Sequence, residues 1–180
     1  MLGCTPEGRF TEQHDIFFGI ANSMKELIPA MNAFWPEAKG DIHIDVWRHV
    51  TAVGNHTIEI VTKGTADNRR QNLFFINLGG YKKNEFDEFH YKTLAVAESM
   101  GQAVKQSKDT AFYNHFGYRG ATSHIDDKFG INVDDLLKVD DMLPVEFKTK
   151  YDIRITKSET VLPEDVFHIG YLKIDKIDQQ

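Results

Sequence analysis

The chain has 180 residues, and its 21 Lys and Arg against 27 Asp and Glu give a formal charge of −6 with histidine neutral. Its composition, with 41% hydrophobic and 27% charged residues, is that of an ordinary globular protein. The acidic balance disfavours nucleic acid as a partner, and no apolar run approaches the roughly 20 residues of a membrane-spanning helix. The single cysteine, Cys4, excludes an intrachain disulfide, which fits a reducing compartment. With no signal peptide visible, we expect a cytoplasmic, bacterial protein with no membrane partner.

The first third of the chain predicts a strand, a helix and a second strand. Residues 14–21 place apolar side chains at every second position, which predicts a strand. Over residues 24–35 the apolar side chains recur at the spacing of one helix face, behind a capping box that opens at Ser23. Pro29 removes a backbone donor inside this helix, so we expect a kink or a late start. Residues 41–50 alternate again and predict the second strand.

The remainder of the chain predicts mainly strands. They are expected at 56–62, 73–80, 90–97, 151–156 and 166–174. Gly54 and Asn55 form a two-residue hairpin turn before the first of these strands. A second capping box, at Ser99, opens a second helix, and the polar residues 64–71 read as a linker.

The two halves of the chain resemble each other, which predicts an internal duplication. Leu2-Gly3 aligns with Leu78-Gly79 (78 − 2 = 76), and the same offset carries His14 onto His90. After two small slips, the triplet His43-Ile44-Asp45 aligns with His124-Ile125-Asp126. We therefore expect an α+β fold that is a tandem duplication of a strand–helix–strand unit with an antiparallel or mixed sheet. The expected parts are a first unit at 1–63, a linker at 64–71, a second unit at 72–144, and C-terminal strands at 145–180 that complete the second unit.

Four of the eight histidines occupy matched positions in the two halves, and each has a carboxylate two residues away. Because residues i and i+2 of a strand project from the same face, each half can bring imidazoles and carboxylates together. The candidate residues are Glu12, His14, His43 and Asp45 in the first half, and Glu88, His90, His124 and Asp126 in the second. Such a set suits zinc, manganese or iron, or an imidazole oriented for proton transfer. The sequence alone favours the simpler interpretation, that these pairs are ordinary hydrogen bonds or ion pairs at the ends of surface strands.

Several of these segments resemble domain of unknown function 1543, a bacterial family with one or two copies of a short unit. In the first half the resemblance rests on Phe10-Thr11-Glu12-Gln13-His14-Asp15, Phe17-Phe18-Gly19, Ala33-Phe34-Trp35-Pro36-Glu37-Ala38 and Ile42-His43-Ile44-Asp45. In the second half it rests on Leu78-Gly79-Gly80-Tyr81, Glu88-Phe89-His90-Tyr91 and Ser123-His124-Ile125-Asp126-Asp127, and it extends to about Pro144. The family has no assigned activity, so the resemblance supports the duplication and implies no catalytic residue.

Together these observations favour a non-enzymatic binding or assembly module of unknown ligand, since a fold alone implies no reaction. The alternative is a metal-binding protein, or a metal-dependent hydrolase, that holds a divalent metal with the matched histidine and carboxylate side chains. We also expect a homodimer. The first half begins with a short stub at Leu2 where the second half has a full strand, and an open sheet edge is a surface for pairing.

Overall fold

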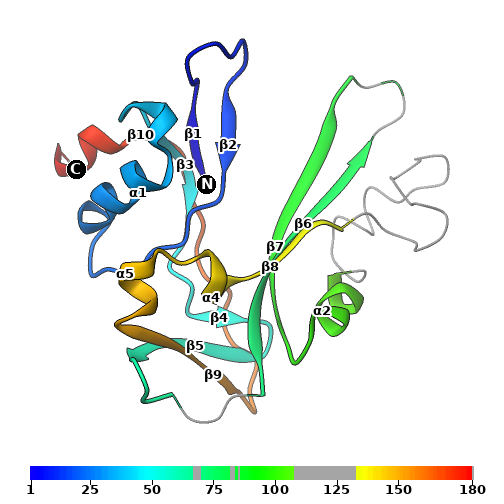
Figure 1. Ribbon diagram of the computed structural model, residues 1–180. Helices are drawn as coiled ribbons and strands as arrows, with labels where there is room; N and C mark the ends of the chain where they lie inside the picture. The colour runs from blue at the N-terminus through cyan, green and yellow to red at the C-terminus, as the bar shows by residue number, and fades with distance from the viewer. Residues whose placement is uncertain (67–69, 82–83, 85, 108–132, 180) are drawn as a thin grey trace.

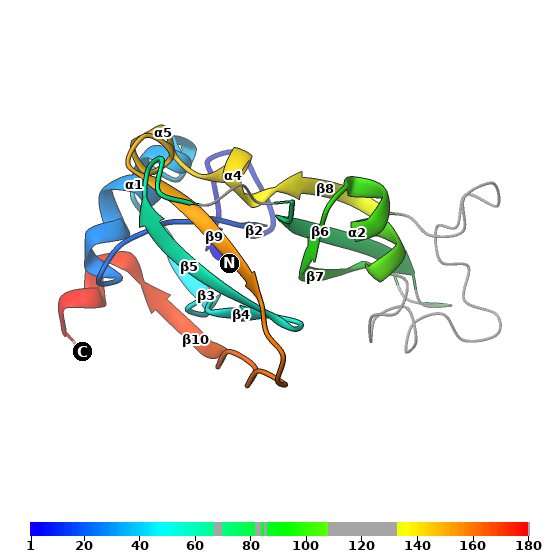
Figure 2. The same cartoon turned by 90° about the horizontal axis from the view of Figure 1, so that it is seen from below.

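The computed structural model describes residues 1–66, 70–81, 84, 86–107 and 133–179 (Figure 1). Within these ranges the strands form three antiparallel sheets, with short helices packed against them. This is the α+β class that the sequence predicts. Seen from below, the third sheet lies to one side of the molecule and the first two sheets lie to the other (Figure 2). No helix in the described part is long and apolar enough to cross a membrane.

The first sheet has the strand order β10-β3-β1-β2. Its strands are β1 (Leu2–Cys4), β2 (Gln13–Asp15), β3 (His43–Trp47) and β10 (His168–Lys173). The helical turns beside it are η1 (Lys25–Leu27), α1 (Ile28–Phe34), η2 (Pro36–Ala38) and η3 (Ile174–Gln179). Leu2, Ile44 and Met31 meet in the apolar core between the sheet and these turns. Pro29 lies in the first turn of α1, so the late start predicted from the sequence is confirmed.

The second sheet has the strand order β4-β5-β9. It consists of β4 (Ala52–Val53), β5 (His56–Thr62) and β9 (Tyr151–Lys157). Val53 pairs with His56, which confirms the predicted two-residue turn between them. The short helices α4 (Val139–Met142) and α5 (Val145–Lys148) precede β9. Ile58 and Ile153 of this sheet share a core with Val139 of α4.

The third sheet has the strand order β7-β6-β8. It consists of β6 (Asn72–Tyr81), β7 (Glu88–Ala97) and β8 (Val133–Lys138), with α2 (Met100–Ser107) against one face. Phe74 and Ile76 of β6 are buried in the core that includes Ala103 of α2, whereas Phe75 packs into the core shared with the second sheet. Burial on both faces explains why β6 reads as an almost continuous apolar run. Ser99 caps α2 as predicted, since its Oγ accepts a hydrogen bond from the backbone N–H of Gln102 at 3.3 Å.

The C-terminal strands differ from the prediction. Residues 145–180 were expected to complete the second unit. Instead, β9 pairs with β5 and β10 pairs with β3, so the end of the chain joins the first and second sheets. The argument for a dimer also changes. The short strand β1 is paired on both sides, by β2 and β3, and the described edges of the first sheet are β2 and β10.

Candidate metal centre

The first sheet brings His14 and His43 together across a glycine. Gly3 of β1 pairs with His14 of β2 on one side and with His43 of β3 on the other. Side chains of directly opposed residues project from the same face, with Cβ atoms about 5 Å apart on neighbouring strands. Two strands of separation would leave the histidine Cβ atoms about 10 Å apart. Because Gly3 has no side chain, the imidazoles lean over it, and their ring centroids are 6.5 Å apart.

Two carboxylates lie against both imidazoles. Glu12 Oε2 is 3.4 Å from His14 Nε2, and Glu12 Oε1 is 3.1 Å from His43 Nε2. Asp45 Oδ2 is 3.3 Å from His14 Nε2, and Asp45 Oδ1 is 3.3 Å from His43 Nε2. Each carboxylate therefore places one oxygen near each ring nitrogen. The i, i+2 spacing predicted in the sequence produces this arrangement, since Glu12 precedes His14 and Asp45 follows His43 by two residues.

These distances have the spacing of ligands around a metal. A direct charged hydrogen bond between imidazole and carboxylate is about 2.7–2.9 Å long, the value expected if the groups simply paired. Ligand atoms about 2.0–2.1 Å from a common ion are separated by about 3.3–3.4 Å in a tetrahedron and about 2.9–3.0 Å between octahedral neighbours. The four nitrogen–oxygen distances fall at 3.1–3.4 Å. One ligand atom from each of Glu12, His14 and His43 also lies within 4.8 Å of the others.

His43 is the buried member of the cluster. Its side chain is 5% exposed, whereas that of His14 is 37% exposed. The ring of Tyr171, from β10, stacks on the His43 ring at a centroid distance of 4.2 Å and an interplanar angle of 26°. Although Glu12 Oε1 is 3.1 Å away, His43 Nε2 makes no hydrogen bond to any described residue, and neither does Asp45 Oδ2. A buried polar atom without a hydrogen bond is costly, and coordination to a cation would satisfy it.

The glycine is part of the site. A Cβ added to Gly3 would lie 2.3 Å from His43 Nε2 and 3.0 Å from Asp45 Oδ2. Any other residue at this position would therefore occupy the space between the ligand atoms. The sequence contains this signal in the matched Leu-Gly pairs of its two halves, but nothing in the sequence links Gly3 to the histidines.

The third sheet repeats the arrangement with fewer groups. Gly79 of β6 pairs with His90 of β7, as Gly3 pairs with His14. His90 Nε2 is 4.0 Å from Glu88 Oε2 and 3.4 Å from Asp134 Oδ2 of β8. A Cβ on Gly79 would lie 2.1 Å from that Asp134 oxygen. Glu88, His90 and Asp134 form a second set of grouped metal-ligating side chains.

Asp134 is a residue that the sequence alignment missed. Leu78 pairs with Val133, as Leu2 pairs with Ile44, so Asp134 occupies the position of Asp45. The predicted residues His124 and Asp126 lie outside the described residues. A signal for the alternative alignment was present, because Ile131-Asn132-Val133-Asp134 reads like Ile42-His43-Ile44-Asp45 with asparagine in place of the histidine.

Cys4 takes no part in either cluster. It is buried in the apolar core of the first sheet, and that burial, with nearby carboxylates, raises the pKa of its thiol. A thiol that stays protonated at neutral pH is a poor nucleophile.

Comparison with known proteins finds a similarity, over less than a third of the chain, to a family described only as a domain of unknown function. The sequence model of the family described as Domain of Unknown Function (DUF1543) matches residues 9–60, which include Glu12, His14, His43 and Asp45. None of the curated proteins matches the chain. Among solved structures, the chain is similar to the crystal structure of a protein Il1583 from Idiomarina loihiensis, at 24% identity and a TM-score of 0.60. That similarity covers 96% of this chain and 92% of the other, and it concerns the fold.

Proposed function

We propose that this protein binds a divalent transition metal between Glu12, His14, His43 and Asp45. The observation that carries the proposal is the set of four nitrogen–oxygen distances of 3.1–3.4 Å around two imidazole nitrogens, above a glycine whose Cβ would fill the space. Two imidazoles and two carboxylates suit zinc, manganese or iron(II). No reaction follows from the ligand set, so the proposal is a binding protein and remains compatible with the non-enzymatic function expected from the sequence.

We also propose that the third sheet is a second copy of the first. Three correspondences support this. The central strand pairs with the next two strands of its sheet in the same order, a helix follows the second strand, and a glycine sits opposite a histidine. Among its described residues, the second copy offers Glu88, His90 and Asp134 as a weaker metal site with one imidazole.

Metal content tests the proposal directly. Protein purified without an affinity tag would be analysed by elemental mass spectrometry, then stripped with chelator and titrated with zinc, manganese and iron(II). We expect one tightly bound ion per chain, and a loss of at least tenfold in affinity when His43 is replaced by glutamine, since loss of even an outer-shell partner costs a metal site about 10–100-fold.

His56→Gln is the matched control, because His56 lies on β5 of the second sheet, outside both clusters. The control should bind like the parent. The proposal would be contradicted if the parent and His43→Gln bound metal with equal affinity. It would also be contradicted if only His56→Gln removed stoichiometric metal.

A further inference from the structure

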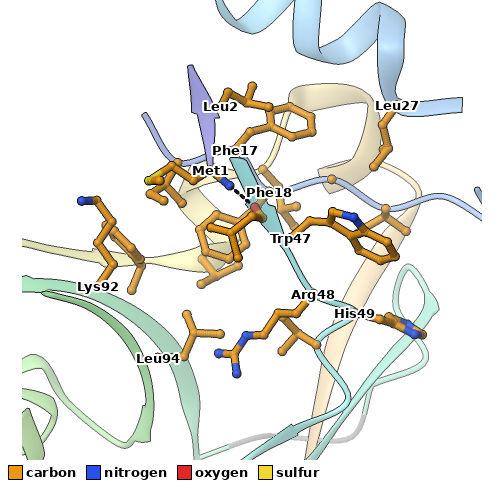
Figure 3. Close-up of a pocket in the computed structure, with 18 of the residues that line it drawn as sticks. Met1, Leu2, Phe17, Phe18, Leu27, Trp47, Arg48, His49, Lys92 and Leu94 are labelled. Atoms are coloured by element: carbon orange, nitrogen blue, oxygen red, sulfur yellow. Dashed lines mark hydrogen bonds between the residues drawn. The ribbon is translucent and has the colours of Figure 1, made fainter. Parts of the chain in front are cut away.

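A large apolar cavity lies where the three sheets meet, and the first metal cluster does not account for it. Its volume is about 470 Å³, within the range of about 300–1,000 Å³ typical of small-molecule sites. The first sheet contributes Leu2 and Ile44, the segment after β2 contributes Phe17 and Phe18, and the third sheet contributes Phe75 and Leu94 (Figure 3).

The cavity lies on the opposite side of β3 from the first metal cluster. Ile44 and Val46 line the cavity, whereas His43 and Asp45 form the cluster. Successive residues of a strand point to opposite faces, so at Ile44 and Val46 the sheet lies between the cavity and the first cluster. Whatever binds in the cavity is therefore distinct from the ligands of the first cluster, whereas His90 of the second cluster lines the cavity.

Two cationic side chains line this apolar space. They are Arg48, just after β3, and Lys92 of β7 (Figure 3). Neither makes an ion pair within 4.0 Å with a described carboxylate. The guanidinium of Arg48 lies 4.8 Å from the ring centroid of Phe167, another lining residue. Burial lowers the pKa of Lys92 below its ordinary value, and the fields of Asp15 and Asp135 offset this only in part.

An apolar chamber lined by two cationic side chains, neither of them ion-paired with a described carboxylate, matches one ligand chemistry. We propose that the cavity binds an unbranched fatty carboxylate, with its chain against Phe18 and Leu94 and its carboxylate at Arg48. The guanidinium is assigned the head group because its planar fork binds a carboxylate with two parallel hydrogen bonds. Lys92 adds positive potential that favours the anionic form of the ligand.

Fluorescence of Trp47 provides the readout, since its indole lines the cavity and stacks on His168 at a centroid distance of 4.1 Å. The protein would be titrated with octanoate, decanoate and dodecanoate, with dodecanol as a neutral analogue and dodecyltrimethylammonium as a cationic one. All would be kept below their micelle concentrations, and calorimetry would give the stoichiometry. We expect one carboxylate per chain, tightening up to about fourfold for each added CH₂. We expect dodecanol to bind at least about tenfold more weakly than dodecanoate, and the cation not to bind.

Variants locate the two ends of the ligand. Arg48→Met should weaken the binding of dodecanoate at least about tenfold and leave the affinity for dodecanol unchanged. Leu94→Trp should weaken the binding of both ligands, because the larger side chain fills the chamber. Lys105→Met, on the exposed side of α2, is the matched charge control and should bind like the parent. Thermal melting would establish that each variant folds.

Three results would overturn the proposal. They are equal affinity for dodecanoate and dodecanol in the parent, a folded Leu94→Trp variant that binds like the parent, and a loss of affinity confined to Lys92→Met. None of them depends on metal, because the titrations use chelator-treated protein, so failure here and failure of the metal site are distinguishable.

Discussion

Replacing Gly3 with alanine tests whether the candidate site requires a glycine at this position or the strand merely tolerates one. In an unobstructed strand, alanine should stabilise the protein by about 0.5–1 kcal/mol, because glycine loses more conformational freedom on folding. Here the new Cβ would lie 2.3 Å from His43 Nε2, whereas non-bonded carbon contacts are comfortable at about 3.5–4.0 Å. His43 has little room to retreat, since its side chain is 5% exposed and stacked on Tyr171. We therefore expect the overpacking cost of about 1–3 kcal/mol to dominate.

Urea unfolding of the metal-free parent and variant would measure this change, and Gly79→Ala is the matched control. Its Cβ would meet the carboxylate of Asp134, a side chain that is 21% exposed and has more freedom to move. The control should therefore lose less stability than Gly3→Ala. With zinc at about 100 times its Kd, the parent should gain about 2.7 kcal/mol, and Gly3→Ala should gain much less. A Gly3→Ala protein as stable as the parent, with the full gain from zinc, would refute the reasoning.

Three other predictions concern packing, pH and assembly. Met31→Ala should lower the free energy of unfolding by about 2–5 kcal/mol in urea titrations, since Met31 is only 2% exposed. Leu27→Ala should lower it by less, because Leu27 is half-buried. Burial alone would raise the pKa of Asp165, but hydrogen bonds from the Thr51 hydroxyl and from two backbone N–H groups outweigh it and lower the pKa. The stability that the ionised Asp165 gives to the folded protein is complete above the ordinary carboxyl pKa. It is lost as pH falls through the lowered pKa of Asp165. Asp165→Asn should thus destabilise at neutral pH, and the difference should shrink in acid melts. Light scattering should show a dimer paired through the β10 edge, where Ile169 is exposed, and Ile169→Lys should give a monomer.

The segment after His14 shows why alternation alone mispredicts a strand. Residues 14–21 alternate as a strand would, but β2 ends at Asp15. Ile16 and Phe18 pack on the core shared by the second and third sheets, whereas Phe17 packs on the core of the first sheet. The chain runs between two apolar cores, so its side chains alternate although its backbone is not paired in a sheet. Apolar residues at every second position therefore do not require a hydrogen-bonded strand, because a chain that runs between two apolar cores shows the same pattern.

Short sequence patterns predicted the structure correctly where an interaction between neighbouring residues determines it. The turn at Gly54 and Asn55 and the cap at Ser99 follow from the chemistry of a few neighbouring residues. Ser23 shows the limit, because the same pattern there precedes a 3₁₀ turn that has no side-chain cap. The pairing of β10 with β3 joins segments more than 120 residues apart, as His168 lies opposite Trp47 (168 − 47 = 121), and no local pattern specifies that choice.

The sequence predicted the residues that meet in the first half, but it did not identify the aspartate of the second half. His43 and Asp45 share a face of β3 by the i, i+2 rule, Glu12 lies just before β2 and two residues from His14, and the structure brings both pairs together. The counterpart of Asp45 required the register of the third sheet, which is set by the pairing of Leu78 with Val133. An alignment guided by a repeated histidine favoured His124-Ile125-Asp126, whereas strand pairing assigns the position to Asp134.

The surroundings of the two clusters explain why the first should hold metal more tightly. Both have a glycine on the central strand, a histidine on one neighbour and an aspartate on the other. Among the described residues, only the first has a second imidazole, that of His43, and a fourth strand that supplies Tyr171 to cover it. A buried ring nitrogen cannot hydrogen-bond to water. Metal coordination should therefore stabilise His43 more than it stabilises the more exposed His90. We therefore expect the first cluster, whose sheet includes β10, to bind metal more tightly than the second.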